Sequence, residues 1–201
     1  MHISEGVLSA PVLVTGAVLS AAGVFIGLKK MDYEKIPEVA VLTSAFFVAS
    51  LIHVPIGPSS THLVLNGLLG ILLGWMVFPS IIVALSLQAL LFQFGGFTSL
   101  GVNTFIMAAP ALIAYYIFAF PVRKTNHFLC ALAGFGAGVT GIGFGALFAA
   151  AALIGTGEAF LNIAKVIVVV HLPVMLIEGI ITSFCVIFLK KVKPEILEVN
   201  R

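Results

Sequence analysis

Charged residues are scarce in this chain: Asp, Glu, Lys and Arg make up 9% of its 201 residues. A soluble domain carries roughly 25%, so this sequence has too few polar side chains to cover a water-facing surface. Hydrophobic residues reach 61%, and the mean hydropathy is +1.21. The composition therefore predicts an integral membrane protein that lies in the lipid bilayer.

Several functional signals are also missing. No phosphate-binding loop with a following Lys-Ser/Thr is present, so any ATP must be hydrolysed by a separate chain. No nucleophile–base set or zinc triad indicates an enzyme, and no nucleic-acid partner is expected. The two cysteines, Cys130 and Cys185, fall in apolar stretches without metal or disulfide spacing and are expected to pack inertly. No Lys or Arg precedes the first apolar run, so we expect no cleaved signal peptide and a mature chain that begins at Met1.

Apolar segments are abundant and predict an all-α membrane bundle that forms one domain over residues 1–201. A spanning helix needs roughly 20 apolar residues, so seven spans fit if the loops are short. Pro79 is expected at the first position of the fourth helix, where its missing N–H costs nothing. The seven segments lie near residues 7–28, 37–53, 62–78, 79–95, 103–121, 127–154 and 162–189.

Positive charges give the predicted orientation. With seven spans, three clusters of Lys and Arg fall on one side of the membrane, which the positive-inside rule makes cytoplasmic. The N-terminus is then outside and the C-terminus cytoplasmic. Lys165 is the one cation elsewhere, and we expect it to snorkel to the interface. The clusters are Lys29, Lys30 and Lys35; Arg123 and Lys124; and Lys190, Lys191, Lys193 and Arg201.

Irregular polar segments gather on the predicted outer side. They are Met1-His2 and residues 53–62, 95–103 and 155–158, all rich in Gly, Ser, Thr, Asn or His. Irregular backbone at the membrane is tolerated where it lines a polar cavity or is buried in protein. We therefore expect a binding site at the outer end.

The chain's beginning has the chemistry of a metal chelate. A free α-amine, the His2 backbone nitrogen and a His2 ring nitrogen lie close together and nearly in one plane. One more imidazole would complete a square of four nitrogens, and His62 is a second outer histidine, expected to start a helix. Such a set favours Ni²⁺ or Cu²⁺ over Zn²⁺. The alternatives are that His2 is incidental and that His62 is an interfacial residue of a polar loop.

Four stretches of the chain carry motifs of a known protein family. They are the start Met1-His-Ile-Ser-Glu-Gly6, the stretch Pro55-Ile-Gly-Pro-Ser-Ser-Thr-His62-Leu-Val-Leu-Asn66-Gly67, the segment from Gln88 to Thr104, and His171-Leu-Pro-Val-Met-Leu-Ile-Glu178-Gly179. Together they resemble the CbiM/NikM family, the substrate-capture membrane subunits of energy-coupling-factor (ECF) transporters for cobalt and nickel.

The resemblance implies a function and a ligand set. It implies high-affinity Ni²⁺ or Co²⁺ binding at the outer face, with the metal as transported substrate and Met1, His2 and His62 as ligands. It further implies seven helices, a bacterial or archaeal cell membrane, and several partners. These are ATPase subunits, a coupling transmembrane subunit and, in some assemblies, a small accessory membrane subunit. Nickel is favoured on geometry, although both metals accept nitrogen donors.

The remaining polar residues leave alternatives open. Gln88, Asn103, Ser60 and Thr61 are candidates to hydrogen-bond a metal-bound imidazole, or they bond neighbouring helices. His171 and Glu178 share a helix face and belong either to a structural network near Pro173 or to the function itself. A self-contained, proton-coupled cation carrier that uses these two residues is the alternative function. Glu5 is expected to favour the positive end of the first helix.

Overall fold

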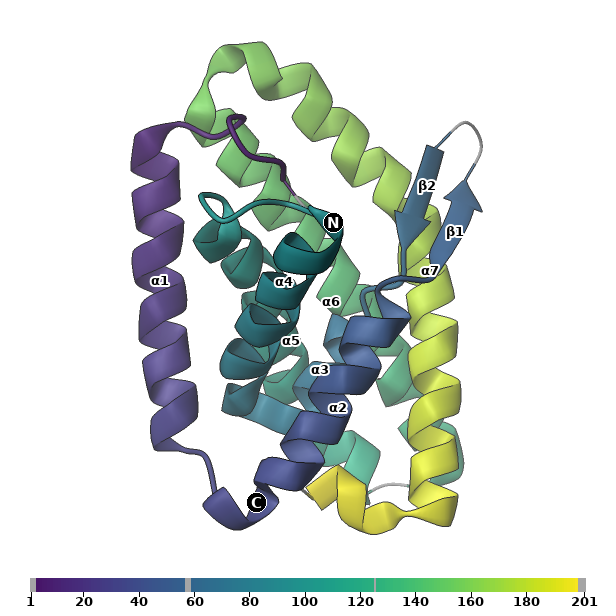
Figure 1. Ribbon diagram of the computed structural model, residues 1–201. Coiled ribbons are helices and arrows are strands. Elements are labelled where there is room, and N and C mark those ends of the chain that lie inside the picture. Colours follow the sequence, from purple (N-terminus) through teal and green to yellow (C-terminus); the bar gives the residue numbers. More distant parts are fainter. Residues whose placement is uncertain (1–2, 57–58, 125, 199–201) are drawn as a thin grey trace.

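The computed structural model describes residues 3–56, 59–124 and 126–198, and it is a bundle of long helices with one short hairpin (Figure 1). Short 3-10 turns join several of the helices. The helices are α1 (Ala10–Lys29), α2 (Ile36–Ala49), α3 (Asn66–Leu73), α4 (Val77–Phe92), α5 (Leu100–Lys124), α6 (His127–Thr156) and α7 (Leu161–Val192). The predicted helical membrane bundle is therefore confirmed.

Fewer helices are long enough to cross a membrane than the seven that the sequence predicts. Five helical stretches in the described chain are long and apolar enough to span a bilayer. The third and fourth predicted segments form one such stretch, in which α3 and α4 are joined by a 3-10 turn at Gly74–Met76. Helix α2 has 14 residues, fewer than the roughly 20 that a span needs. Seven crossings and the outside location of the N-terminus therefore stay predictions.

Two local predictions at helix starts are wrong. Pro79 is the third residue of α4, which begins at Val77. It remains within the first turn, where backbone N–H groups have no partner in the helix. His62 does not start a helix, because it ends a strand and α3 begins at Asn66.

The segment before α3 forms a hairpin instead of an open loop. Strands β1 (His53–Ile56) and β2 (Ser59–His62) pair antiparallel, and His53 is opposite His62 in the register. At the base of the hairpin, the Leu63 N–H donates to the Ile52 carbonyl at 3.1 Å. The hairpin lies beside α7, at the end opposite to the C-terminus (Figure 1).

Glycines allow the central helices α3, α6 and α7 to pack backbone against backbone. A Cβ on Gly67 would overlap the carbonyl of Ala137, and one on Gly138 would lie 2.5 Å from the carbonyl of Glu178. Small residues permit such close approach between membrane helices. Four glycines of α6 are buried: Gly134, Gly138, Gly141 and Gly145.

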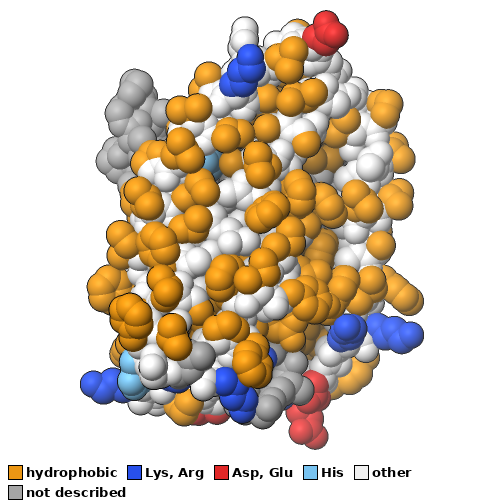
Figure 2. All heavy atoms as spheres, turned by 180° about the vertical axis from the view of Figure 1, so that it is seen from behind, with side chains coloured by type: hydrophobic (Ala, Val, Ile, Leu, Met, Phe, Trp, Pro, Cys, Tyr) orange, Lys and Arg blue, Asp and Glu red, His pale blue; other side chains and the backbone are white. Residues whose placement is uncertain are grey.

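The molecular surface is apolar around the middle and charged at its ends. Large hydrophobic side chains are exposed on several helices, including Phe25, Phe120, Phe128 and Phe184. Figure 2 shows hydrophobic side chains over most of one face, with Lys and Arg gathered at one end. We call this end, which carries the helix ends at Lys29, Arg123 and Lys190, the basic end. The opposite end, with the hairpin and residues 93–99, is the hairpin end.

Candidate functional site: two anchored segments at the hairpin end

The N-terminal segment is bound to the start of α5 by one buried amide. The Ile3 N–H donates to Asn103 Oδ1 at 2.9 Å, and Asn103 Nδ2 donates to the Ile3 carbonyl at 3.0 Å. Asn103 Nδ2 also donates to Ser99 Oγ at 3.1 Å. Asn103 is 2% exposed, so these bonds are shielded from solvent. A single side chain therefore fixes both backbone polar groups of residue 3.

Glu5 extends this attachment to the loop before α5. The Glu5 N–H donates to the Gly95 carbonyl at 3.2 Å, and the Thr98 N–H donates to Glu5 Oε1 at 3.0 Å. A Cβ on Gly96 would overlap the Glu5 side chain. The expected role of Glu5 at the start of α1 is wrong, because α1 begins at Ala10 and Glu5 holds the 95–98 loop instead.

Apolar contacts complete the binding of the N-terminal segment. Ile3 and Leu8 are buried in a cluster formed with α5, α6 and α7. The Ser9 N–H donates to Thr156 Oγ1 at 3.2 Å, which joins the segment to the end of α6. The other buried members of this cluster are Val102, Ile106, Ala149, Ala150, Leu153 and Ala164. The N-terminal segment is thus packed on the bundle through Ile3 and Leu8.

A second irregular segment, just after the hairpin, is held by α7. The Leu65 N–H donates to both oxygens of Glu178, at 2.9 and 3.1 Å, and the Val64 N–H donates to Glu178 Oε1. Glu178 is completely buried. Its contacts cross to α3, so the expected local network around Pro173 does not describe its bonding.

Asn66 joins this second segment to α5 and α6. Its Nδ2 donates to the carbonyls of Met107, at 3.2 Å, and of Gly141, at 3.1 Å. Met107 lies four residues after Asn103 on α5, which is about 6 Å along a helix. The two anchored segments therefore attach to α5 one helical turn apart.

Two further polar residues singled out in the sequence, Gln88 and His171, form hydrogen bonds within the bundle. Gln88 Nε2 donates to Ser50 Oγ at the end of α2, two residues before Ile52 at the hairpin base. His171 Nδ1 bonds the Ile167 carbonyl at 2.7 Å, while its buried Nε2 has no partner among the described residues. Gln88 thus joins α4 to the end of α2, just before the hairpin, and His171 makes its one described hydrogen bond through Nδ1.

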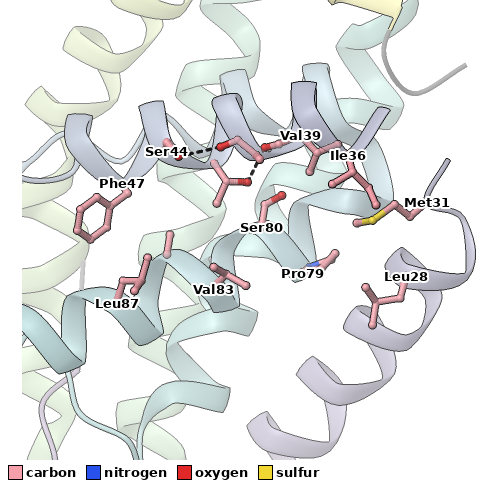
Figure 3. A pocket seen from close by; sticks show the side chains of 13 residues that line it. Leu28, Met31, Ile36, Val39, Ser44, Phe47, Pro79, Ser80, Val83 and Leu87 are labelled. Carbon is pink, nitrogen blue, oxygen red and sulfur yellow. Dashed lines mark hydrogen bonds between the residues drawn. The ribbon is translucent and has the colours of Figure 1, made fainter. Parts of the chain in front are cut away.

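An apolar groove of about 360 Å³ between α2 and α4 is separate from this site. Figure 3 shows its lining side chains, including Leu28, Met31, Phe47 and Val83. It contains none of the predicted site residues. The two anchored segments, and not this groove, are therefore the candidate site.

Comparison with known proteins identifies the family of the chain. The family model for the cobalt-uptake substrate-specific transmembrane region, CbiM, matches residues 2–196. The chain belongs to the CbiM family. Its family consists of cobalt and nickel transport membrane proteins, so the resemblance seen in the sequence is confirmed, and the chain is a multi-pass membrane transport protein.

Two relatives and one solved structure show how far the similarity extends. A Haemophilus influenzae protein, provisionally named as a metal transport protein, is 44% identical over 98% of this chain and 97% of its own. An Archaeoglobus fulgidus protein, provisionally named as a fused nickel transport protein NikMN, is 32% identical over 98% of this chain and 68% of its own. A crystal structure of a transition metal transporter is 27% identical, with a TM-score of 0.74 over 96% of this chain and 93% of that chain.

The predicted metal ligands of this CbiM family member lie largely outside the described residues. Met1 and His2 are not described, and for His62, as for Ser60 and Thr61, the backbone is described but not the side chain. Within the described part, no group of three or more His, Cys, Asp or Glu side chains could hold a metal ion. The ligand set therefore stays a prediction, next to two anchors that the structure does describe.

Sequence reasoning missed the anchored backbone groups of this CbiM chain. The sequence left open whether Asn103 and Gln88 bond a metal-bound imidazole or neighbouring helices. In the described contacts they bond Ile3 and Ser50, and their role toward a metal-bound imidazole stays a prediction. Val64 and Leu65 carry no polar side chain, so nothing in the sequence marked them as partners of Glu178. The one available signal is Glu178 itself, an acid within an apolar helix, because such an acid needs N–H donors and the first N–H groups of a helix such as α3 have no partner within that helix.

Proposed function

We propose that this chain captures Ni²⁺ or Co²⁺ with high affinity at the hairpin end and is the substrate-binding subunit of an ECF transporter. The ligands are the Met1 amine, the backbone and ring nitrogens of His2, and the ring of His62. The metal is the transported substrate.

The observation that carries this proposal is the clamp of Asn103 on Ile3. Residue 3 directly follows the proposed chelate, and both of its backbone polar groups are bound by one buried side chain. A chelate built on a chain end loses conformational entropy when it closes. Fixing residue 3 beforehand lowers this loss, which is the advantage of preorganisation.

The spacing of the two anchors supports a shared site. Ile3 and Asn66 attach to α5 about one turn apart, and His62 precedes Asn66 by four residues. A residue advances the chain by at most about 3.6 Å. Each ligand-bearing segment is therefore anchored on α5 within a few residues of its proposed ligand. The two anchoring residues, Asn103 and Met107, lie about 6 Å apart along the helix.

The partner and topology follow from the family and the charge distribution. No described segment has a nucleotide-binding motif, so energy for release is supplied by separate ATPase and coupling membrane subunits. The hairpin end faces outward and the basic end faces the cytoplasm, in keeping with the positive-inside rule. In this arrangement α2, α3 and α4 complete seven segments, with the N-terminus outside.

The nitrogen-rich ligand set favours nickel. Four nitrogens in a plane suit Ni²⁺, and the Irving–Williams order places Ni²⁺ above Co²⁺. The proton-coupled carrier receives no support from the contacts of Glu178, which is bound to two backbone N–H groups.

Equilibrium Ni²⁺ binding by the purified chain, with an intact and untagged N-terminus, tests this function. Replacing His62 by Ala, or inserting Gln after Met1, should abolish binding and the yellow absorption of square-planar Ni²⁺. His127→Ala is the matched control, because His127 is exposed at the start of α6 near the basic end. If either test variant binds Ni²⁺ as the parent does, the proposed ligand set is wrong.

A further inference from the structure

Glu178 is a carboxylate in the middle of α7 with no exposed surface. A buried charge is very costly unless it is paired or strongly hydrogen-bonded. Its partners are two consecutive backbone N–H groups, those of Val64 and Leu65, at the start of α3. The first N–H groups of a helix have no partner within the helix, and its positive dipole end attracts anions. The two N–H groups thus provide hydrogen bonds to the buried carboxylate, and the carboxylate provides the acceptor that the start of α3 lacks.

The start of α3 cannot supply this cap from its own sequence. The residue before α3, Leu65, has no side-chain oxygen and adopts a left-handed conformation with φ of 49°. This conformation is unfavourable for a residue with a Cβ and persists only where the surroundings impose it. Glu178 supplies the missing acceptor from a helix more than one hundred residues away in the chain. The bonds from Val64 and Leu65 keep the strained turn in place.

The anchor lies immediately beside the proposed ligand His62. One residue further on, Leu63 closes the hairpin base on Ile52 at 3.1 Å. Val64 follows at once and binds Glu178. The Cα atoms of His62 and Val64 are at most about 7 Å apart, since each residue spans no more than 3.6 Å. The residues that Glu178 holds, Val64 and Leu65, therefore set the direction in which β2 and His62 leave the start of α3.

Glu178 is itself held rigidly. Gly138 of α6 packs against the Glu178 carbonyl so closely that a Cβ there would lie 2.5 Å away. Gly67 of α3 packs on the Ala137 carbonyl one residue earlier. The backbones of the three helices are therefore packed tightly at this level, which fixes the point from which the Glu178 side chain extends.

We propose that Glu178 is the positioning residue of the metal site: through Val64 and Leu65 it fixes the segment that presents His62, and its negative charge favours a divalent cation there. This inference rests on the proposed function. Glu178 does not ligate the metal. It acts on the geometry of a ligand in another segment, and on the electrostatic potential in a medium of low dielectric constant.

Replacing Glu178 by Gln tests the inference. Gln has nearly the same shape but no charge, and its amide NH₂ would point at an N–H donor in place of the second acceptor oxygen. We expect the Ni²⁺ dissociation constant to rise about 10- to 100-fold, the usual cost of losing a group that orients a metal ligand. The absorption band of the bound Ni²⁺ should also change. Amide hydrogen exchange at Val64 and Leu65 should become faster without metal.

A matched control lies one turn away on the same helix face. Thr182 is also completely buried, and its hydroxyl has no hydrogen-bond partner in the described chain. Thr182→Val preserves shape and should leave Ni²⁺ affinity and spectrum unchanged. A Glu178→Gln variant that binds Ni²⁺ within about twofold of the parent, with the parent's spectrum, overturns the inference.

Glu178→Asp decides the matter if the Gln variant does not fold. Asp keeps the charge but is one methylene too short to reach Val64 and Leu65, so it should weaken binding and accelerate exchange at these two amides; parental values for both contradict the inference. The two proposals fail differently. If His62→Ala abolishes binding while both Glu178 variants bind normally, only the positioning role is wrong. If His62→Ala binds normally, the proposed function is wrong.

Discussion

The two ends of the molecule bind backbone groups with different side chains. At the hairpin end, Glu178 accepts from the Val64 and Leu65 N–H groups. Asn103 both accepts from the Ile3 N–H and donates to the Ile3 carbonyl. At the basic end, cations donate to carbonyls near helix ends. Arg123 Nη2 donates to the Ile71 carbonyl at 3.2 Å, and Lys190 Nζ donates to the carbonyls of Val122 at 2.8 Å and Arg123 at 3.3 Å.

The difference indicates that side chains at the hairpin end position irregular segments, whereas side chains at the basic end stabilise the ends of helices. The side chains of Asn103 and Glu178 at the hairpin end are buried, so their hydrogen bonds are strong and hold the bound segments firmly in place. The cations at the basic end are only half buried and long, and they complement the negative ends of helices. Substitutions at the hairpin end should therefore change metal binding, whereas those at the basic end should change stability alone.

The largest effect is expected from Asn103→Leu. This change removes both bonds to Ile3 and leaves two buried backbone groups unsatisfied, at about 1–3 kcal/mol each. The N-terminal segment should leave its place, and Ni²⁺ affinity should fall at least about 100-fold, since 1.4 kcal/mol is a factor of ten. Isothermal titration calorimetry measures this loss.

The neighbouring residue provides the control for Asn103→Leu. Thr104 is completely buried, and its hydroxyl has no partner among the described residues. Thr104→Val should therefore bind Ni²⁺ like the parent. Equal affinities in the Asn103 and Thr104 variants would show that the clamp on Ile3 does not matter for metal capture.

A smaller effect at the same end is expected from Gly96→Ala. Gly96 has φ of 144°, and a Cβ there would overlap the Glu5 side chain. Strain of about 1–2 kcal/mol and displacement of Glu5 should weaken Ni²⁺ binding about tenfold. Gly157→Ala separates the two causes, because Gly157 also has a positive φ (158°) but no atom within 4 Å of the added Cβ. An equal loss in both variants would argue against a specific role of the Glu5 contact.

The sequence predicted the bundle because membrane helices carry a strong local signal. The apolar runs predicted seven segments. The structure has helices in all of these regions, but only five helical stretches in the described chain are long enough to span a bilayer, since the third and fourth segments form one stretch and α2 is short. The Ser59–His62 region was harder, because Ser and Thr after Pro58 are compatible with a strand or with a helix start. The hairpin depends on pairing between β1 and β2, which local sequence does not encode.

The anchors of the candidate site escaped prediction for a related reason. Asn103 and Glu178 could be recognised as polar residues in apolar helices, but their partners are backbone groups of Ile3, Val64 and Leu65. Backbone groups are the same in every residue, so no residue type marks them. Only the packing of α3 against α7, and of the N-terminal segment against α5, brings them together.

At the basic end, Lys190→Met should lower stability without changing metal binding. Lys190 is half buried, and its ammonium group binds two carbonyls at the end of α5. Loss of these bonds should cost about 1 kcal/mol of unfolding free energy, measured by thermal denaturation in detergent. The adjacent and exposed Lys191 provides the control, since Lys191→Met removes the same charge without these contacts. A drop in Ni²⁺ affinity in Lys190→Met would contradict the division between the two ends.

The smallest effect is expected from Lys30→Gln. The Lys30 ammonium lies 5.2 Å from the centre of the Trp75 ring, which also donates from Nε1 to the Tyr116 hydroxyl at 2.8 Å. An exposed cation–π contact contributes about 0.5 kcal/mol, so stability should change little and Ni²⁺ affinity not at all. Because Trp75 is the single tryptophan of the sequence, its fluorescence reports this contact directly and should shift in Lys30→Gln but not in Lys29→Gln. Identical spectra in both variants would mean that Lys30 does not hold Trp75, and that α1 is joined to the basic end by packing alone.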